Sequence, residues 1–374
     1  MEMARSALFG FLVFALTSVA TFATDAGKQN PQVNLYNKGV EEAARDNYSK
    51  AILFFTMAIE IEPQFAPAYV ERGRAYIGLK DYPRAVSEIS KGIKLNPKSA
   101  YAYVQRGLAL SLQGQIDPAF KDLAQAEKLD AKEIRVFLVR AIIFDRIGDT
   151  DQAIRSISEA IKMDPIMVYP YVKRGGFYIK KRAWQKALQD SNKAIELNNG
   201  RATWAYKNRA VVYGEIGEWE KSLKDFETAQ KFYPLNAEVF WARGWMFARK
   251  GNHNKAIADY NIAISLEKKP TTALVGRGSS YCELGDFKKG FADLQRAIKL
   301  DPMLGDAYFT RGYYYCRRNL LDKALTDLNR AISLDPTNEN AFFVRGMVFF
   351  QKSMFSRAFQ DFGAGIRAFQ KNYP

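Results

Sequence analysis

One short phrase recurs along this 374-residue chain at a fixed interval. Residues 297–302 read AIKLDP, and residues 331–336, thirty-four positions later, read AISLDP. About ten residues after each copy comes a small residue, most often glycine, whose successive positions lie 34 apart except for one interval of 35. A fixed period of this length indicates a repeat protein, in which each repeat is one supersecondary unit. We call the recurring small position the glycine slot; it is filled by Gly39, Gly73, Gly107, Ala141, Gly175, Ala210, Gly244, Gly278, Gly312 and Gly346.

Each repeat predicts two helices joined by a short turn. Turn signals such as LGDF at 284–287 divide the repeat, and Asp or Asn followed by Pro closes four copies, as at 301–302. The aromatic residues four positions before and three positions after the glycine slot share one helical face with it, as Tyr69, Gly73 and Tyr76 illustrate. Small residues also recur twelve and nineteen positions after the slot. The two helices of a repeat can therefore approach each other closely.

This set of positions resembles the tetratricopeptide repeat family. The resemblance implies an all-α fold, a right-handed superhelical solenoid of antiparallel helix pairs whose concave groove is lined by the first helix of each repeat. It also implies recognition of proteins or peptides. The first repeat has Lys38 in place of the usual arginine and Glu42 in place of the usual aromatic residue, and we interpret it as a terminal cap. Ten repeats are predicted within 32–372, at 32–65, 66–99, 100–133, 134–167, 168–202, 203–236, 237–270, 271–304, 305–338 and 339–372.

The N-terminus precedes the repeats and has a different character. Residues 6–23 are apolar and uncharged, and small residues near Ala23 and Ala26 suit cleavage, so residues 1–26 predict a secretory signal peptide, followed by a linker at 27–31. The apolar run is nearly long enough to span a bilayer, so a retained membrane anchor is the alternative. We expect an exported protein, periplasmic or secreted, or a membrane-anchored one if the segment is retained.

An arginine precedes the glycine slot in nine repeats, from Arg72 to Arg345, and an acid follows sixteen residues later in eight of them. The row of charges could grip a ligand, but we favour ion pairs that join the two helices of each repeat.

Nothing in the sequence proposes an enzyme, a cofactor or a metal site. The single histidine, His253, falls where other repeats place an aromatic residue between helices, and the chain has no phosphate-binding glycine loop. Cys282 and Cys316 hold equivalent positions in adjacent repeats. Neighbouring helices pack about 8–10 Å apart, whereas a disulfide needs α-carbons within roughly 7 Å. We therefore expect two unbridged thiols that face the groove.

The strongest departure from the scaffold lies in repeats 5 to 7. In the resembled family, the positions six and three before the glycine slot and one, four and five after it face the groove. Here they hold three tryptophans for which the sequence offers no packing reason, although drift of a loosely constrained repeat is the alternative explanation. Aromatic residues and arginine dominate binding energies at interfaces. The candidate residues are Tyr169, Lys180, Trp204, Lys207, Trp241, Trp245 and Arg249, with a second patch in repeat 9 at Phe309, Tyr313 and Arg317.

The preferred functional hypothesis is a non-catalytic protein–protein interaction scaffold whose groove, centred on repeats 5–7, binds a partner segment. The net charge of +15 favours a partner with acidic as well as apolar groups. One alternative is a scaffold for an anionic glycan or envelope polymer. Another is a structural spacer that acts through its ends, including a homodimer through repeat 10. A nucleic-acid partner would suit the positive charge, because lysine and arginine neutralise phosphates, but an exported protein seldom meets nucleic acid.

Overall fold

The computed structural model of the chain describes residues 30–372. The predicted signal segment at 1–26 and most of the predicted linker therefore lie outside the described residues. Within the described part the chain forms twenty helices and no strand, which confirms the all-α prediction. No helix in this part combines the length and the apolar character needed to cross a bilayer.

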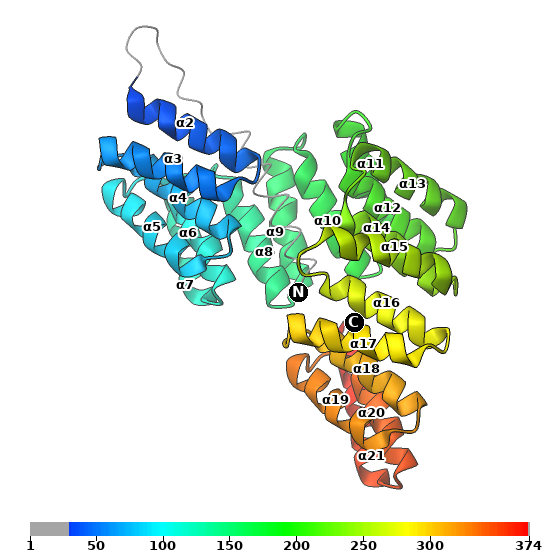
Figure 1. Ribbon diagram of the computed structural model, residues 1–374. Coiled ribbons are helices and arrows are strands. Elements are labelled where there is room, and N and C mark those ends of the chain that lie inside the picture. Colours follow the sequence, from blue (N-terminus) through cyan, green and yellow to red (C-terminus); the bar gives the residue numbers. More distant parts are fainter. Residues whose placement is uncertain (1–29, 373–374) are drawn as a thin grey trace. The chain divides into compact units, whose positions relative to one another are not determined.

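The helices form two compact units, which meet between Gly200 and Arg201 in the sequence. In each unit the helices come in pairs, a first and a second helix joined by a short turn (Figure 1). Unit 1 contains α2 (Pro31–Ala44), α3 (Tyr48–Ile61), α4 (Ala66–Gly78), α5 (Tyr82–Leu95), α6 (Ala100–Leu112), α7 (Ile116–Leu129), α8 (Arg135–Arg146), α9 (Thr150–Met163), α10 (Val168–Lys180) and α11 (Trp184–Leu197). Unit 2 contains α12 (Thr203–Glu215), α13 (Trp219–Phe232), α14 (Ala237–Arg249), α15 (His253–Leu266), α16 (Thr271–Glu283), α17 (Phe287–Leu300), α18 (Gly305–Arg317), α19 (Leu321–Leu334), α20 (Glu339–Gln351) and α21 (Phe355–Asn372).

The link between the two units coincides with the one irregular interval of the repeat. The closing Asp/Asn-Pro phrase is missing here, and the sequence continues as NNGR at 198–201. Asn199 and Gly200 both adopt left-handed conformations, with φ of 47° and 74°. The extra residue of the 35-residue interval is therefore accommodated after the end of α11.

The local sequence explains where the helices begin and end. Between the first and second helix of a pair the chain turns through a left-handed residue, such as Gly251 (φ 79°) or Gly285 (φ 86°). The residue that directly follows often caps the second helix; the Asp286 carboxylate, for example, accepts a hydrogen bond from the Lys289 backbone N–H at 3.1 Å. Second helices end where Asp precedes Pro, because a residue before proline favours extended backbone. Asp301 shows this conformation, with φ −141° and ψ 93°.

The small positions of the repeat lie where the two helices of a pair touch. A methyl group added at Gly73 would lie 2.5 Å from Ile89 Cγ1 and 3.0 Å from the Ala85 carbonyl oxygen. The small residues twelve and nineteen positions after the slot are buried in every described pair. The backbone separation of a pair thus leaves little or no space for more than a methyl-sized side chain at these points.

The regular spacing of arginine and acid produces an ion pair with a buried carboxylate in eight of the ten helix pairs. Arg106 donates from Nε and Nη2 to the two carboxylate oxygens of Asp122, both at 2.7 Å, and from Nη1 to Ser90 Oγ at 3.3 Å. It therefore joins the first helix, the second helix and the second helix of the preceding pair. The acids are buried, which the sequence alone did not reveal, and the ion-pair interpretation is confirmed. The eight pairs are Arg72–Glu88, Arg106–Asp122, Arg174–Asp190, Arg209–Asp225, Arg243–Asp259, Arg277–Asp293, Arg311–Asp327 and Arg345–Asp361.

The glycine slots differ in how tightly they are packed, and this difference is testable within unit 1. Replacement of Gly73 by Ala should lower the free energy of unfolding by about 1–3 kcal/mol, since the new methyl group meets backbone and the branched Ile89 side chain. At Gly175 the nearest atoms lie 3.6 Å away. Gly175→Ala should be neutral or stabilise unit 1 by up to about 1 kcal/mol, because alanine is the better helix former. Urea denaturation of both variants measures the difference, and equal effects would contradict the packing argument.

The ion pairs of Arg106 and Arg140 provide a matched comparison. Both arginines are about a quarter exposed, but the Asp122 side chain is 8% exposed whereas Glu127, the partner of Arg140, is 41% exposed. Arg106→Ala should cost about 3–5 kcal/mol, because it leaves a buried carboxylate without its partner. Arg140→Ala should cost less than about 1 kcal/mol of ion-pair energy. Chemical denaturation measures both changes; a similar loss in the two variants would show that carboxylate burial does not matter here.

Candidate functional site: the first-helix face

The side chains that could contact a partner lie on the first helices of the pairs. In unit 2 the first helices α12, α14, α16, α18 and α20 contact one another in succession, while each second helix packs against the first helix of the next pair. The first helices therefore form a continuous layer within this unit. We call the side of this layer that faces away from the second helices the first-helix face. Its candidate residues in unit 2 are Trp204, Lys207, Trp241, Trp245, Arg249, Phe309, Tyr313 and Arg317.

The three candidate tryptophans come together on two adjacent helices, α12 and α14. All three are half-buried. Trp241 and Trp245 pack against a core cluster that contains Phe226 and Met246. The expectation that these tryptophans have no packing role was therefore wrong for Trp241 and Trp245, since one side of each ring supports the core and the remaining surface is accessible.

Each candidate cation of this region is paired with a carboxylate of a neighbouring repeat. Lys207 forms an ion pair with Glu238, and Arg249 binds Glu215 at 3.2 Å. Both cations also lie over tryptophan rings: Lys207 Nζ is 5.4 Å from the Trp204 ring centre, and Arg249 Cζ is 5.1 Å from that of Trp245. Cation–π contacts at such sites contribute about 0.5–1 kcal/mol each. The first-helix face of α12 and α14 is thus aromatic and locally charge-balanced rather than simply basic.

The two candidates of repeat 5 belong to unit 1 and behave differently. Tyr169 is 9% exposed and lies in the core cluster of that unit, so its ring offers little surface to a partner. Lys180 forms an ion pair with Asp145 of the preceding repeat and lies over the Phe177 ring. Sequence periodicity assigned Tyr169 to the groove side of its helix, but neighbouring side chains bury it.

The second candidate patch, in repeat 9, is a hydrogen-bonded cluster. Phe309 and Tyr313 pack with ring centres 6.5 Å apart, and Arg317 lies over the Tyr313 ring. Arg317 Nη1 and the Tyr314 hydroxyl both donate to Glu283 Oε1 at 2.8 Å. Partial burial acts to raise the pKa of Glu283, but these two hydrogen bonds together with the positive charge of Arg317 and the nearby His253 hold that pKa below its usual value. Here too, the candidate arginine is already bound to an acid of the preceding repeat.

A buried charged network in unit 1 was not anticipated from the sequence. Arg74 is 3% exposed and donates to Glu71 at 2.6 Å, while the Tyr101 hydroxyl donates to the other Glu71 oxygen at 2.8 Å. Arg135 lies 4.6 Å from the Tyr101 ring centre. Burial acts to lower the pKa of Arg74, but the charge and hydrogen bond of Glu71 together with the neighbouring Tyr101 and Tyr36 outweigh it and raise that pKa. The available signal was Arg74 itself, because the position after the glycine slot holds no other charged residue in the ten repeats.

The surroundings of the cysteines and of the histidine were predicted only in part from the sequence. Cys282 and Cys316 are both free, as expected. Cys282, however, is 1% exposed and lies against Gly290 between the helices of its own pair, so the expectation that it faces the groove was wrong. His253 begins α15 and lines a hollow beside the α14–α15 turn. Within residues 30–372 no cluster of three or more His, Cys, Asp or Glu side chains could hold a metal ion.

The burial of Cys282 gives a testable reactivity. Burial raises the pKa of this thiol to about 12. Because only the thiolate reacts, alkylation of Cys282 at pH 8 should be slower in the native protein than in the urea-unfolded chain by roughly a thousandfold, and should accelerate as the pH rises. Mass spectrometry of peptides labelled with N-ethylmaleimide measures the rate. Equal rates in the native and unfolded chain would contradict the buried position.

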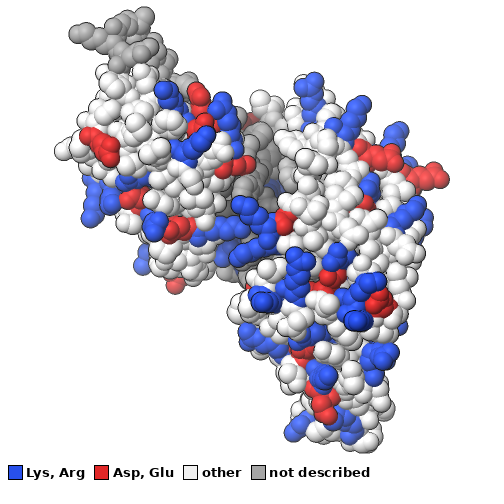
Figure 2. Space-filling view, in the orientation of Figure 1, with Lys and Arg blue, Asp and Glu red and all other residues white. Residues whose placement is uncertain are grey.

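The surface outside this face carries two further features. On the face in view in Figure 2, Lys and Arg are interspersed with Asp and Glu. The last helix, α21, exposes large apolar side chains on one side. They lie at intervals of three to seven residues, and they are Phe355, Phe359, Ile366 and Phe369, between 49% and 66% exposed.

Comparison with known proteins agrees with this architecture. Models described as "Tetratricopeptide repeat" match residues 66–99, 208–271 and 271–302, and one described as "TPR repeat" matches 312–353. The chain belongs to the tetratricopeptide repeat proteins. A search of curated proteins found no match.

Two solved structures illustrate the shared fold. A tetratricopeptide repeat protein from Parabacteroides merdae aligns over 67% of this chain and 99% of its own, with a TM-score of 0.54 and 17% identity. The Cut9–Hcn1 hetero-tetramer of the APC/C aligns over 92% of this chain and 82% of its own, with a TM-score of 0.54 and 13% identity. At this identity the likeness concerns the fold alone.

Proposed function

We propose that the protein is a non-catalytic scaffold that binds a segment of a partner protein on the first-helix face of α12 and α14. The observation that carries the proposal is the accessible surface of three half-buried tryptophans on two adjacent helices, Trp204, Trp241 and Trp245; the equivalent positions of the other pairs hold no tryptophan. Protein recognition is also the general role of the family. Export, as expected from the N-terminal sequence, places the partner in the envelope or outside the cell.

The contacts of these tryptophans indicate how binding would work. The rings of Trp241 and Trp245 pack against the core, Lys207 lies over the Trp204 ring and Arg249 over the Trp245 ring, so these side chains lose little conformational freedom on binding. An apolar side chain of the partner would cover the accessible ring surface. An acidic group would have to compete with Glu238 and Glu215 for the two cations. Apolar contacts therefore supply the affinity, and acidic groups mainly set the register.

Two alternatives rest on other parts of the same surface. Tryptophan and tyrosine faces also stack on sugar rings, so an anionic glycan would use the same residues. A spacer that acts through its ends, or a homodimer, would use the exposed apolar side of α21 instead. The following experiment separates these alternatives from the proposed function.

The test is affinity capture from the native envelope or secretory fraction with the wild type, Trp245→Ala and Trp219→Ala. Both tryptophans are half-buried in unit 2 and pack against the same cluster, so the two variants lose similar packing. Trp219 begins α13 and lies away from the first-helix face. Trp245→Ala should weaken capture of a specific protein by about thirtyfold, as expected for loss of one aromatic anchor, and Trp219→Ala should not.

Circular dichroism establishes that the variants are folded before capture is compared. Equal capture by the two variants would refute the role of the first-helix face. Loss of retention on an immobilised anionic polysaccharide, with protein capture intact, would identify the glycan alternative. Loss of capture only in Phe359→Ser would place the binding surface on α21.

A further inference from the structure

The turns between first and second helices in unit 2 carry an excess of basic residues. The five turns comprise residues 216–221, 250–255, 284–289, 318–323 and 352–357, and nine basic against four acidic residues give them a net charge of 9 − 4 = +5. The corresponding turns of unit 1 have a net charge of 7 − 5 = +2; that at 181–186 holds three basic residues, whereas those at 113–118 and 147–152 hold none. The basic residues of unit 2 are Lys221, Lys250, Lys255, Lys288, Lys289, Arg318, Lys323, Lys352 and Arg357.

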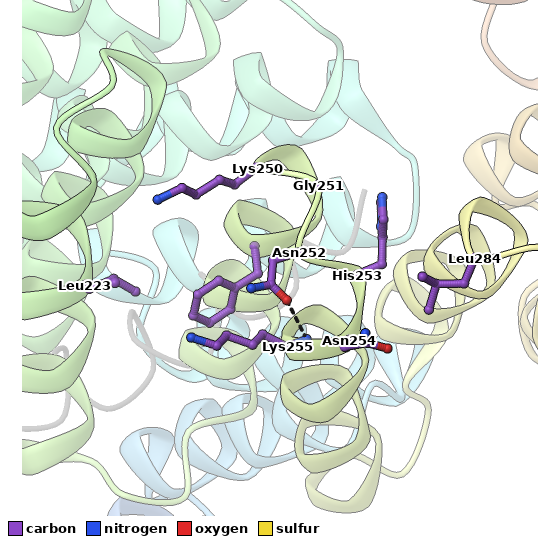
Figure 3. A pocket seen from close by; sticks show the side chains of 9 residues that line it. Leu223, Lys250, Gly251, Asn252, His253, Asn254, Lys255 and Leu284 are labelled. Atoms are coloured by element: carbon purple, nitrogen blue, oxygen red, sulfur yellow. Dashed lines mark hydrogen bonds between the residues drawn. The ribbon is translucent and has the colours of Figure 1, made fainter.

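Contacts between successive turns join them into one continuous edge, which we call the turn strip. Lys250 Nζ lies 5.0 Å from the Trp219 ring centre, and Arg318 Cζ lies 4.7 Å from that of Phe287. Lys352 forms an ion pair with Asp322 at 2.8 Å. The remaining link, between the turns at 250–255 and 284–289, is formed by the residues around the hollow in Figure 3.

That hollow is lined from three elements. It has a volume of about 350 Å³ and lies between Leu223, the α14–α15 turn and Leu284 of the next turn. Figure 3 shows Lys250 and Lys255 on its rim, with Asn252 capping α15. Two basic side chains of the α14–α15 turn thus lie close to an apolar residue of the next turn.

Much of the positive charge on the turn strip is not neutralised within the protein. Lys221, Lys289 and Lys352 have carboxylate partners. Among the described residues, no ion pair is formed by Lys250, Lys255, Lys288, Arg318, Lys323 or Arg357. All six are exposed. Five second helices also begin at this strip, and the partial positive charge of a helix N-terminus adds to that of the side chains.

The turn strip also displays single apolar side chains between its basic residues. The exposed fractions are 44% for Ile216, 49% for Leu284, 41% for Leu320 and 49% for Phe355. They are separated by lysines and arginines and form no continuous apolar groove, so they do not suit a docked helix of a partner protein. Basic residues interspersed with exposed apolar ones are the composition that binds an anionic lipid interface, where cations meet the headgroups and apolar side chains enter the acyl boundary.

We propose that the turn strip of unit 2 docks on an anionic lipid surface. A bilayer presents its charge over an extended plane, so adjacent turns can engage it at the same time. The first-helix face of the same helices lies on a different side from the turns and stays available for a partner. The protein would thereby hold its partner at a membrane surface without a spanning helix in unit 2.

The test is partitioning of the full chain onto vesicles of phosphatidylcholine with and without phosphatidylglycerol. The apolar N-terminal segment should bind both compositions alike, so the ratio of the two partition coefficients isolates the charge-dependent contribution. Lys255→Glu/Lys289→Glu/Lys323→Glu removes cations at equivalent positions of three adjacent turns. This variant should lower the ratio by more than about tenfold.

The matched control is Lys231→Glu/Lys268→Glu/Lys299→Glu. These lysines are exposed in the same unit but lie in or beside the loops at the opposite ends of the second helices. The control makes the same change in net charge and should leave the ratio within about twofold of the wild type. If both variants lose binding equally, the effect is one of net charge and the proposal is overturned, as it is if the wild type shows no preference for anionic vesicles.

The apolar side chains separate a lipid surface from a soluble polyanion. Leu284→Ser/Leu320→Ser should weaken binding to anionic vesicles while leaving retention on immobilised heparin unchanged. If this variant binds vesicles as the wild type does, the turn strip recognises charge alone and the lipid assignment is wrong. Circular dichroism of each variant establishes that folding is retained before the ratios are compared.

Discussion

The buried arginine–carboxylate pair is the interaction on which the rest of this structure depends. A carboxylate between two helices is costly to bury, and the guanidinium repays that cost only in a narrow geometry, with two parallel hydrogen bonds. Arg243, for example, binds both oxygens of Asp259 and reaches Gln230 of the preceding pair. One side chain thus sets the register within a pair and between pairs. Flanking aromatic rings, such as Phe240, exclude water from the arginine.

A second consequence of the repeat is that charges on the first-helix face are balanced between neighbours. Lys207 binds Glu238, Arg249 binds Glu215 and Arg317 binds Glu283, in each case across two repeats. The net charge of the whole chain therefore says little about this face. Selectivity here must come from ring surfaces and shape, whereas the positive charge that remains available lies on the turns of unit 2. The molecule offers two chemically different surfaces on one scaffold.

Most of the fold could be predicted from sequence because each repeat satisfies the same local rules. The glycine slot, the turn residue and the Asp-Pro ending act within a few residues, so a single repeat contains the information for its own helix pair. The division near Gly200 falls at the interval of 35 residues, where the closing proline is missing, although the sequence predicted a single run of ten repeats. The candidate site could be predicted less completely than the fold. Periodicity identified the side of the helix for Trp245, but it could not show that Trp245 supports the core or that Tyr169 is buried.

The sequence by itself determined the helix pairs, their number and their spacing, since those follow from backbone propensities and from small residues at contact points. Only the tertiary structure decided which charges are neutralised, because an ion pair such as Arg249–Glu215 joins residues of different repeats and depends on how they stack. It also decided burial, as Cys282 shows: its position four residues after the slot was the same as that of Cys316, yet neighbouring side chains enclose Cys282 and leave Cys316 half-exposed. Local periodicity specifies the side of a helix on which a residue lies, whereas the accessibility of that residue depends on the side chains that pack against it.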